Sequence, residues 1–95
     1  MKKYRIIPTK KYRKDYERLR KSGVDLGKLE SVIDRLAAGE LLPMKYQDHS
    51  LHGNMRHIRE CHIGPDWLLC YTKNEGNLVL LLLATGDHRH VLGIE

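Results

Sequence analysis

The sequence of 95 residues has no phenylalanine, one tryptophan, three prolines and two cysteines. Two cysteines cannot build the disulfide framework of a small secreted domain, and the spacing of Cys61 and Cys70 fits no zinc motif. We therefore expect reduced, buried thiols, as in a cytosolic protein. No apolar run approaches the roughly 20 residues that span a bilayer, and the basic N-terminus lacks the apolar segment of a signal peptide. We expect no contact with a membrane.

What the sequence does contain fits one globular domain covering residues 1–95. Its residues are 41% hydrophobic and 31% charged, and a chain this short buries one modest core. The 17 basic and 12 acidic residues give a formal net charge of +5, and most of the excess lies between Lys2 and Lys21. Such uneven positive charge favours a polyanionic partner, such as nucleic acid, over a simple role in solubility.

The first half of the chain has the pattern of a strand followed by two helices. The short apolar run Tyr4–Ile7 predicts the strand, and Thr9 can cap a helix over Lys10–Lys21. Asp25 can cap a second helix, in which apolar residues recur at helical spacing over Leu26–Ala37. Two amphipathic helices with a short link containing glycine predict a helical hairpin.

The second half has the pattern of a loop followed by three strands. The polar segment Leu41–Gly53 predicts the loop, and the strands are expected at Met55–Ile63, Trp67–Thr72 and Leu78–Ala84. The last of these is apolar on both faces, which is typical of an interior strand. The order β-α-α-β-β-β predicts an α+β fold, with a mostly antiparallel sheet and helices on one face. The other face is then available for binding.

Polar clusters follow several of the predicted strands. In a three-stranded meander the ends of neighbouring strands lie close together, and the long loop can reach the same end of the sheet. This geometry brings together five side chains: His49, His62, Asp66, Trp67 and His88. Histidines beside a carboxylate can move protons near neutral pH, which suits attack of an RNA 2′-hydroxyl on the adjacent phosphate. An exposed tryptophan could stack on a base.

Each of these residues also has a purely structural interpretation. Trp67 can belong to the core, and His88 can cap a terminal helix. Metal binding competes for the same residues, because His49 and His52, or His88 and His90, have tolerable ligand spacing. No third ligand accompanies either pair, so we expect neither a metal nor another cofactor.

Three motifs in order, YQDHSLHG (46–53), RECHIGPDW (59–67) and TGDH (85–88), resemble the YafQ-type toxins of the RelE/ParE superfamily. The resemblance covers nearly the whole chain and implies a small microbial-RNase-like RelE fold with a short C-terminal helical turn. It implies a bacterial type II toxin: an mRNA interferase that cuts mRNA in the ribosomal A site without metal, by attack of the 2′-hydroxyl. It also implies a cytoplasmic, monomeric free toxin and a cognate antitoxin protein as partner.

The resemblance assigns expected roles to single residues. The catalytic positions are His49, His62, Asp66 and His88, without a decision on which histidine is base and which is acid. The expected RNA-binding positions are Trp67 and Arg59, which match the family, together with Leu92 and with the cations Lys45 and Arg56, which the family pattern does not assign. Family members tend to have an aromatic residue near Leu92, and Arg59 has an ion pair with a sheet neighbour as its alternative role.

Ala84 departs from the family pattern, which usually has an arginine just before the Thr-Gly pair, contacting the scissile phosphate. Loss of one such donor typically costs about a hundred- to a thousandfold in rate, and Lys45, Arg56, Arg59 or Arg89 could replace it only in part. We therefore expect an attenuated enzyme, whether Ala84 is natural or an engineered replacement.

Two other functions stay open at this point. A ParE-like toxin would act on DNA gyrase. The set of histidines disfavours this function, because binding to gyrase needs no proton transfer. A non-catalytic basic RNA-binding module would use the positive charge alone. Replacing His88 by glutamine separates it from the enzyme, since only an enzyme loses cleavage.

Overall fold

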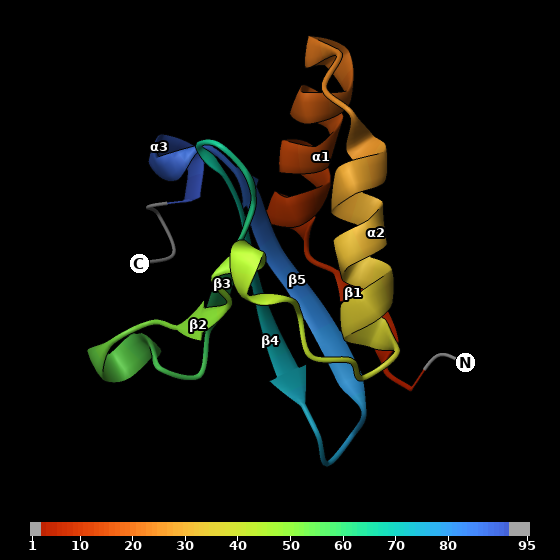
Figure 1. The fold of residues 1–95 in the computed structure, drawn as a ribbon, viewed down its shortest axis with the longest axis vertical. Helices are drawn as coiled ribbons and strands as arrows, with labels where there is room; N and C mark the ends of the chain where they lie inside the picture. The colour runs from red at the N-terminus through yellow and green to blue at the C-terminus, as the bar shows by residue number, and fades with distance from the viewer. Residues whose placement is uncertain (1–2, 92–95) are drawn as a thin grey trace.

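The computed structural model of the protein describes residues 3–91, in which two helices cover one face of a twisted sheet (Figure 1). The elements in chain order are β1 (Arg5–Pro8), α1 (Lys10–Ser22), α2 (Leu26–Ala37), the 3-10 turn η1 (Met44–Tyr46), β2 (His49–Ser50), the 3-10 turn η2 (Gly53–Met55), β3 (Arg59–Gly64), β4 (Trp67–Asn74), β5 (Val79–Gly86) and α3 (His88–Val91). None of the helices in this part of the chain is long and apolar enough to cross a bilayer.

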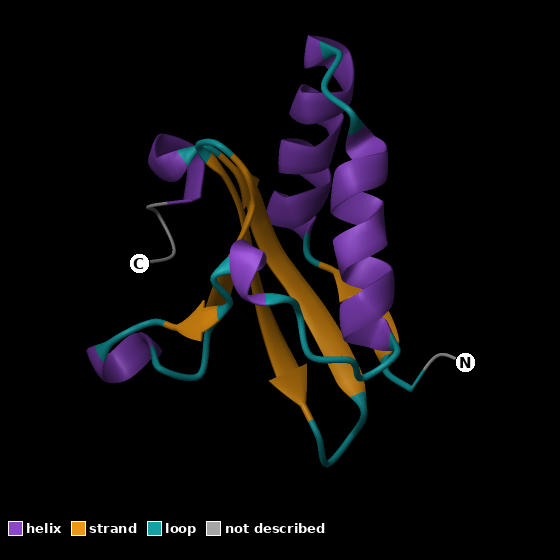
Figure 2. Cartoon of the chain, in the orientation of Figure 1, coloured by secondary structure: helices purple, strands orange, loops and turns teal. Residues whose placement is uncertain are grey.

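Within the described residues, the sheet has five strands in the order β1-β5-β4-β3-β2 (Figure 2). The strands β2 to β5 pair antiparallel with their neighbours, whereas β1 runs parallel to β5. The predicted α+β fold with a mostly antiparallel sheet is thus confirmed. The strand that opens the fold lies beside β5, with β5 in the interior of the sheet as its apolar sequence indicates.

The two long helices begin at the caps that the sequence predicts. The Thr9 hydroxyl accepts the N–H of Tyr12 at 3.2 Å, and Oδ1 of Asp25 accepts the N–H of Gly27 at 3.0 Å. Each bond satisfies a backbone donor that a helix start leaves without a partner. Gly23 ends α1 in the left-handed region, with φ of 83°, which glycine adopts at little cost.

Apolar side chains pack on both faces of the sheet. The larger cluster fills the space under the helices and contains Tyr4, Tyr12, Leu29, Val32, Ile33, Leu36, Ala37, Cys61, Ile63, Leu69, Tyr71, Leu80 and Leu82. The smaller cluster on the opposite face contains Leu51, Ile58, Leu68, Cys70, Ala84 and Val91. Both cysteines are fully buried thiols outside any disulfide, as predicted, and burial raises the pKa of the Cys61 thiol.

A β-bulge in β5 changes which face its side chains occupy. Cys70 pairs with Ala84 and Tyr71 pairs with Leu82, so Leu83 is an extra residue between them. Before the bulge Leu82 packs under the helices, whereas Ala84 belongs to the cluster on the opposite face. Strict alternation would place Ala84 on the same face as Leu82. The bulge instead places Ala84 on the face opposite the helices.

The region before β3 differs from the predicted structure. The sequence predicts a strand from Met55, but β3 begins at Arg59 and Met55 ends a 3-10 turn. Local bonds form instead of a strand ladder, since the N–H of Met55 donates to the His52 carbonyl at 3.2 Å. The predicted loop also contains the short strand β2, in which His49 pairs with Glu60 of β3. Tertiary pairing and turn bonds here override strand propensity.

Candidate active site

Asp66 and His88 meet where the β3–β4 turn and the end of β5 lie together. Nδ1 of His88 lies 2.7 Å from Oδ1 of Asp66, and the backbone N–H of His88 donates to the same oxygen at 3.3 Å. The hydrogen bond from the imidazole, followed by that from the backbone, lowers the pKa of the Asp66 carboxyl. An ionised Asp66 makes Nδ1 of His88 the donor, so Nε2 is the nitrogen that can exchange a proton with a substrate.

Two further histidines lie on the sheet face opposite the helices. The ring centres of His49 and His62 are 6.3 Å apart. Nδ1 of His49 donates to the Gln47 carbonyl at 2.6 Å, and Nε2 lies 3.4 Å from Oε1 of Glu60. The imidazole of His49 is thereby held between a backbone carbonyl and a carboxylate, which fixes its orientation.

Glu60 is a buried carboxylate that the sequence reasoning did not select. Glu60 is 6% exposed, and its Oε2 accepts a weak hydrogen bond from the thiol of Cys70 at 3.8 Å. The strand alternation could have identified it, because Glu60 and His62 are two residues apart and share one face. Buried carboxylates need partners, and His49 and Cys70 are the ones this face supplies.

A single cross-strand row links these groups to Ala84. His49 pairs with Glu60, Glu60 with Cys70, and Cys70 with Ala84, in register across four strands. Ala84 is 0% exposed and packs with Leu68 and Val91, among others. Apolar side chains therefore cover Ala84, the position at which the resemblance predicts an arginine.

A buried carboxylate in α1 holds the end of β5. Asp15 is 3% exposed, and its Oδ2 accepts the backbone N–H of Thr85 at 3.1 Å. Lys11 and Arg18 bind the same carboxylate, each at 3.0 Å, and Nη2 of Arg18 also donates to the Thr85 carbonyl at 3.3 Å. Both backbone groups of Thr85 are thus held by α1. The sequence predicted an amphipathic helix with a cationic surface here and did not identify Asp15.

Trp67 supports the same segment from the helix-covered face. Its Nε1–H donates to Oγ1 of Thr85 at 3.1 Å, and the Thr85 hydroxyl donates to the Leu68 carbonyl at 2.8 Å. The indole packs against the larger core cluster. Trp67 is next to Asp66 in the sequence, but its side chain lies on the helix-covered face of the sheet, opposite to that of His62.

Arg59 forms the ion pair that the sequence offered as its alternative role. Its Nε donates to Oδ1 of Asp48 at 3.2 Å, and the hydroxyl of Tyr71 donates to the same oxygen at 2.7 Å. Burial raises the pKa of the Tyr71 hydroxyl, which keeps it a donor. These bonds fasten the segment before His49 to β3 and β4.

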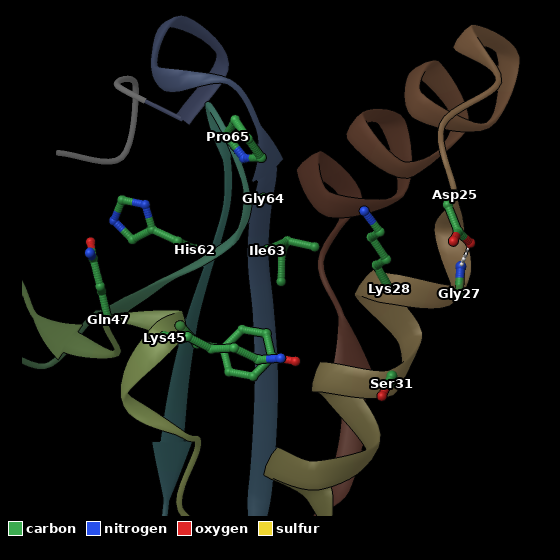
Figure 3. Close-up of a pocket in the computed structure, with 11 residues that line it drawn as sticks. Asp25, Gly27, Lys28, Ser31, Lys45, Gln47, His62, Ile63, Gly64 and Pro65 are labelled. Atoms are coloured by element: carbon green, nitrogen blue, oxygen red, sulfur yellow. Dashed lines mark hydrogen bonds between the residues drawn. The ribbon is translucent and has the colours of Figure 1, made fainter.

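The other predicted RNA-binding residues are dispersed. Lys45 is exposed in η1 and lines a cleft together with His62 (Figure 3). Arg56 is exposed at the end of η2. Leu92 lies outside the described residues.

Residues 3–91 contain no group of three histidine, cysteine, aspartate or glutamate side chains placed to hold a metal ion. His88 and His90 use Nδ1 for different carboxylates, those of Asp66 and Asp87, each at 2.7 Å. The hydrogen bond from His90 lowers the pKa of the Asp87 carboxyl. What the site offers is imidazole groups oriented by carboxylates, an arrangement suited to proton transfer.

Comparison with known proteins identifies the family of the chain. The profile of a family described as the bacterial toxin of a type II toxin–antitoxin system, YafQ, matches residues 4–93. A relative from Escherichia coli K12, the mRNA interferase toxin YafQ, is 34% identical over 83 residues, which is 86% of this chain and 88% of that protein.

Solved structures of similar sequence share the fold. A metal-bound toxin from Helicobacter pylori superposes with a TM-score of 0.86 at 39% identity, covering 93% of this chain and 98% of that one. The E. coli DinJ–YafQ toxin–antitoxin complex gives a TM-score of 0.86 at 30% identity, covering 96% of this chain and 99% of that one. The match therefore extends over the elements that carry the site.

Proposed function

Because the chain belongs to the YafQ family of bacterial type II toxins, we propose that it is an mRNA interferase that cleaves mRNA on the ribosome. The contact of 2.7 Å between Asp66 and His88 carries this proposal. A carboxylate that orients an imidazole is the arrangement of a general acid–base catalyst, and the basic charge of the chain suits an RNA substrate. A gyrase-binding toxin or a passive RNA-binding module would not need such a pair.

The reaction uses only protons and the substrate's own oxygens. One imidazole removes the proton of the 2′-hydroxyl, whose oxygen attacks the adjacent phosphorus and forms a cyclic phosphate. The bond to the 5′-oxygen breaks, and a second imidazole gives that oxygen a proton. His88 and the pair His49 and His62 are the candidates for these two roles. Ala84 contributes no positive charge to the phosphorane, so we propose that this toxin cleaves slowly.

Partners follow from the charge of the helices and from the family. Five exposed cations, Lys10, Arg13, Lys14, Arg20 and Lys21, line α1, and we propose that this surface contacts ribosomal RNA. The DinJ–YafQ complex of E. coli supports a cognate antitoxin as the protein partner. The site of action is then the bacterial cytoplasm, where ribosomes and mRNA meet.

Primer-extension mapping of mRNA with purified ribosomes tests the proposal. The protein should produce cuts within translated codons, and His88→Gln should remove them while RNA binding remains. A chelator selective for transition metals, with Mg²⁺ left for the ribosome, should change nothing. Cleavage that survives His88→Gln would contradict the proposed role of this pair, and cleavage that requires a transition metal would contradict the mechanism.

A further inference from the structure

The edge of β3 is only partly covered. β2 pairs with β3 at Arg59 and Glu60, and no strand among residues 3–91 pairs with the same edge from Cys61 to Gly64. A cleft of about 750 Å³ lies along this free edge, between η1 and the start of α2. A volume of this size is typical of sites for small molecules or single nucleotides.

The cleft is continuous with the proposed catalytic face. His62 lines it on one side of β3 and Ile63 on the other, as expected for successive residues of a strand (Figure 3). Gly64 and Pro65 line its end and lead directly to Asp66. A nucleic-acid strand bound at His62 would therefore enter this cleft where it crosses the edge of β3.

Positive charge comes into the cleft from both walls. The side chain of Lys28 extends from α2 and that of Lys45 from η1, both into the gap between these elements (Figure 3). The Lys45 ammonium lies 5.2 Å from the centre of the Tyr46 ring, and within residues 3–91 neither ammonium is paired with a carboxylate. The carboxylate of Asp25, also at the rim, is engaged as the cap of α2.

We propose that this cleft binds the nucleotide next to the scissile phosphate, with its own phosphate held between Lys28 and Lys45. The inference rests on the proposed endoribonuclease function and adds a substrate subsite to it. Lysines contact phosphate as point charges and read no bases, so the subsite strengthens binding without setting sequence preference. Tyr46 and Ile63 supply an apolar wall for the sugar and base.

Binding of labelled, uncleavable 2′-O-methyl oligoribonucleotides to the full chain tests this subsite. Lys28→Ala and Lys45→Ala should each weaken binding about five- to tenfold, as expected for loss of one charged hydrogen bond. Each should also reduce the slope of log affinity against log salt by about 0.7. The matched control is Arg35→Ala, which removes one charge two turns along α2, outside this cleft. It should change the affinity less than twofold.

Oligonucleotides extended by one nucleotide on the 5′ or the 3′ side locate the contact. The unmodified protein should gain affinity from extension on one side, and the two lysine variants should lose that gain. Equal binding by all three variants would overturn the subsite and leave the cleavage by the wild-type protein as evidence for the proposed function. Absence of any ribosome-dependent cleavage would instead contradict the function itself.

A protein segment could also lie along a free strand edge. If the lysine variants keep their RNA affinity but bind an antitoxin segment more weakly, the cleft belongs to that protein and the subsite is wrong. Lys28→Gln and Lys45→Gln, which keep most of the side-chain length, serve as a second pair. They should behave as the alanine variants do, because the charge is what the proposal requires.

Discussion

The carboxylate of Asp15 accepts the backbone N–H of Thr85, 70 positions later in the chain, at 3.1 Å. His88 follows Thr85 by three residues, so α1 holds the strand end that carries the proposed catalytic histidine. Lys11 and Arg18 compensate the charge of the buried carboxylate. The first helix is therefore a support for the site as well as a basic surface.

Replacing Asp15 by alanine should destabilise the protein strongly. The Thr85 amide would lose its partner in the interior, and the two cations would lose the carboxylate that neutralises them. We expect the free energy of unfolding to fall by about 3–5 kcal/mol, measured by urea denaturation. Asp34→Ala, at an exposed position of α2, should stay within about 0.5 kcal/mol of the unmodified protein. If both variants lost a similar amount of unfolding free energy, the bonds of Asp15 to Thr85, Lys11 and Arg18 would not be what stabilises the fold here.

Replacing Glu60 by glutamine should slow cleavage without weakening RNA binding. Glutamine keeps the size of the side chain but removes the negative charge that faces Nε2 of His49 at 3.4 Å. We expect a rate about 10- to 100-fold lower, a part of what one positioned acid–base group supplies. Single-turnover cleavage at saturating ribosome concentration measures it. Glu40→Gln, at an exposed position, is the control and should leave the rate unchanged, whereas an unchanged rate in Glu60→Gln would remove Glu60 from the site.

The pKa of Asp66, lowered by the hydrogen bond from His88, gives a prediction for acid pH. A carboxyl whose pKa is lower in the folded state stabilises the fold above its ordinary value of about 3.9. That contribution is lost as the pH falls through the lower folded value. The stability difference between the wild-type protein and Asp66→Asn should therefore shrink below about pH 4. Urea denaturation at several pH values measures it, and a constant difference down to pH 2 would contradict it.

The lowered pKa of Asp66 also gives a prediction for the pH dependence of cleavage. Asp66 stays ionised between about pH 5 and 8, where histidine is the side chain that ordinarily titrates. Any change of rate in this window should therefore persist in Asp66→Asn, on a lower overall rate. A pH profile that became flat in this variant would assign the titration to Asp66 instead.

Ala84→Arg should raise the cleavage rate by about a hundredfold if the missing guanidinium limits it. The same change should lower the free energy of unfolding by about 1–3 kcal/mol, because it adds a long side chain to a filled apolar cluster. Ala84→Met adds similar bulk without charge and is the matched control. It should lose stability and gain no activity. If Ala84→Arg cleaves no faster than Ala84→Met, the toxin is not attenuated at this position.

The features that local signals determine could be predicted from the sequence. Thr9 and Asp25 cap helices through bonds to the next two or three residues, and the turn residues between β3 and β4 are consecutive. The contact of Asp66 with His88 spans 22 positions, but it follows from the meander, in which consecutive strands are neighbours in the sheet. These parts of the fold and of the site need only the local signals and the order of the strands.

The features that the sequence did not reveal depend on distant pairing or on one irregular residue. Asp15 lies in a helix rich in cations and has the pattern of a solvent-exposed residue until Thr85 is placed beside it. Leu83 is one of several consecutive leucines, and nothing in its surroundings marks it as the bulge. The short strand β2 forms only because Glu60 and Arg59 offer it a partner. In each case the stabilising bond joins segments that a window of neighbouring residues does not contain.

The parallel pairing of β1 with β5 also governs when the protein can act during its own synthesis. β1 is made long before its partner β5, because Arg5 pairs with Val79 across most of the sequence. A domain that depends on such distant contacts folds late and as a unit. The chain that is still being translated therefore lacks both a finished sheet and a held His88. The proposed cleavage activity should therefore appear only after β5 has been made, because the contact of His88 with Asp66 cannot form before then.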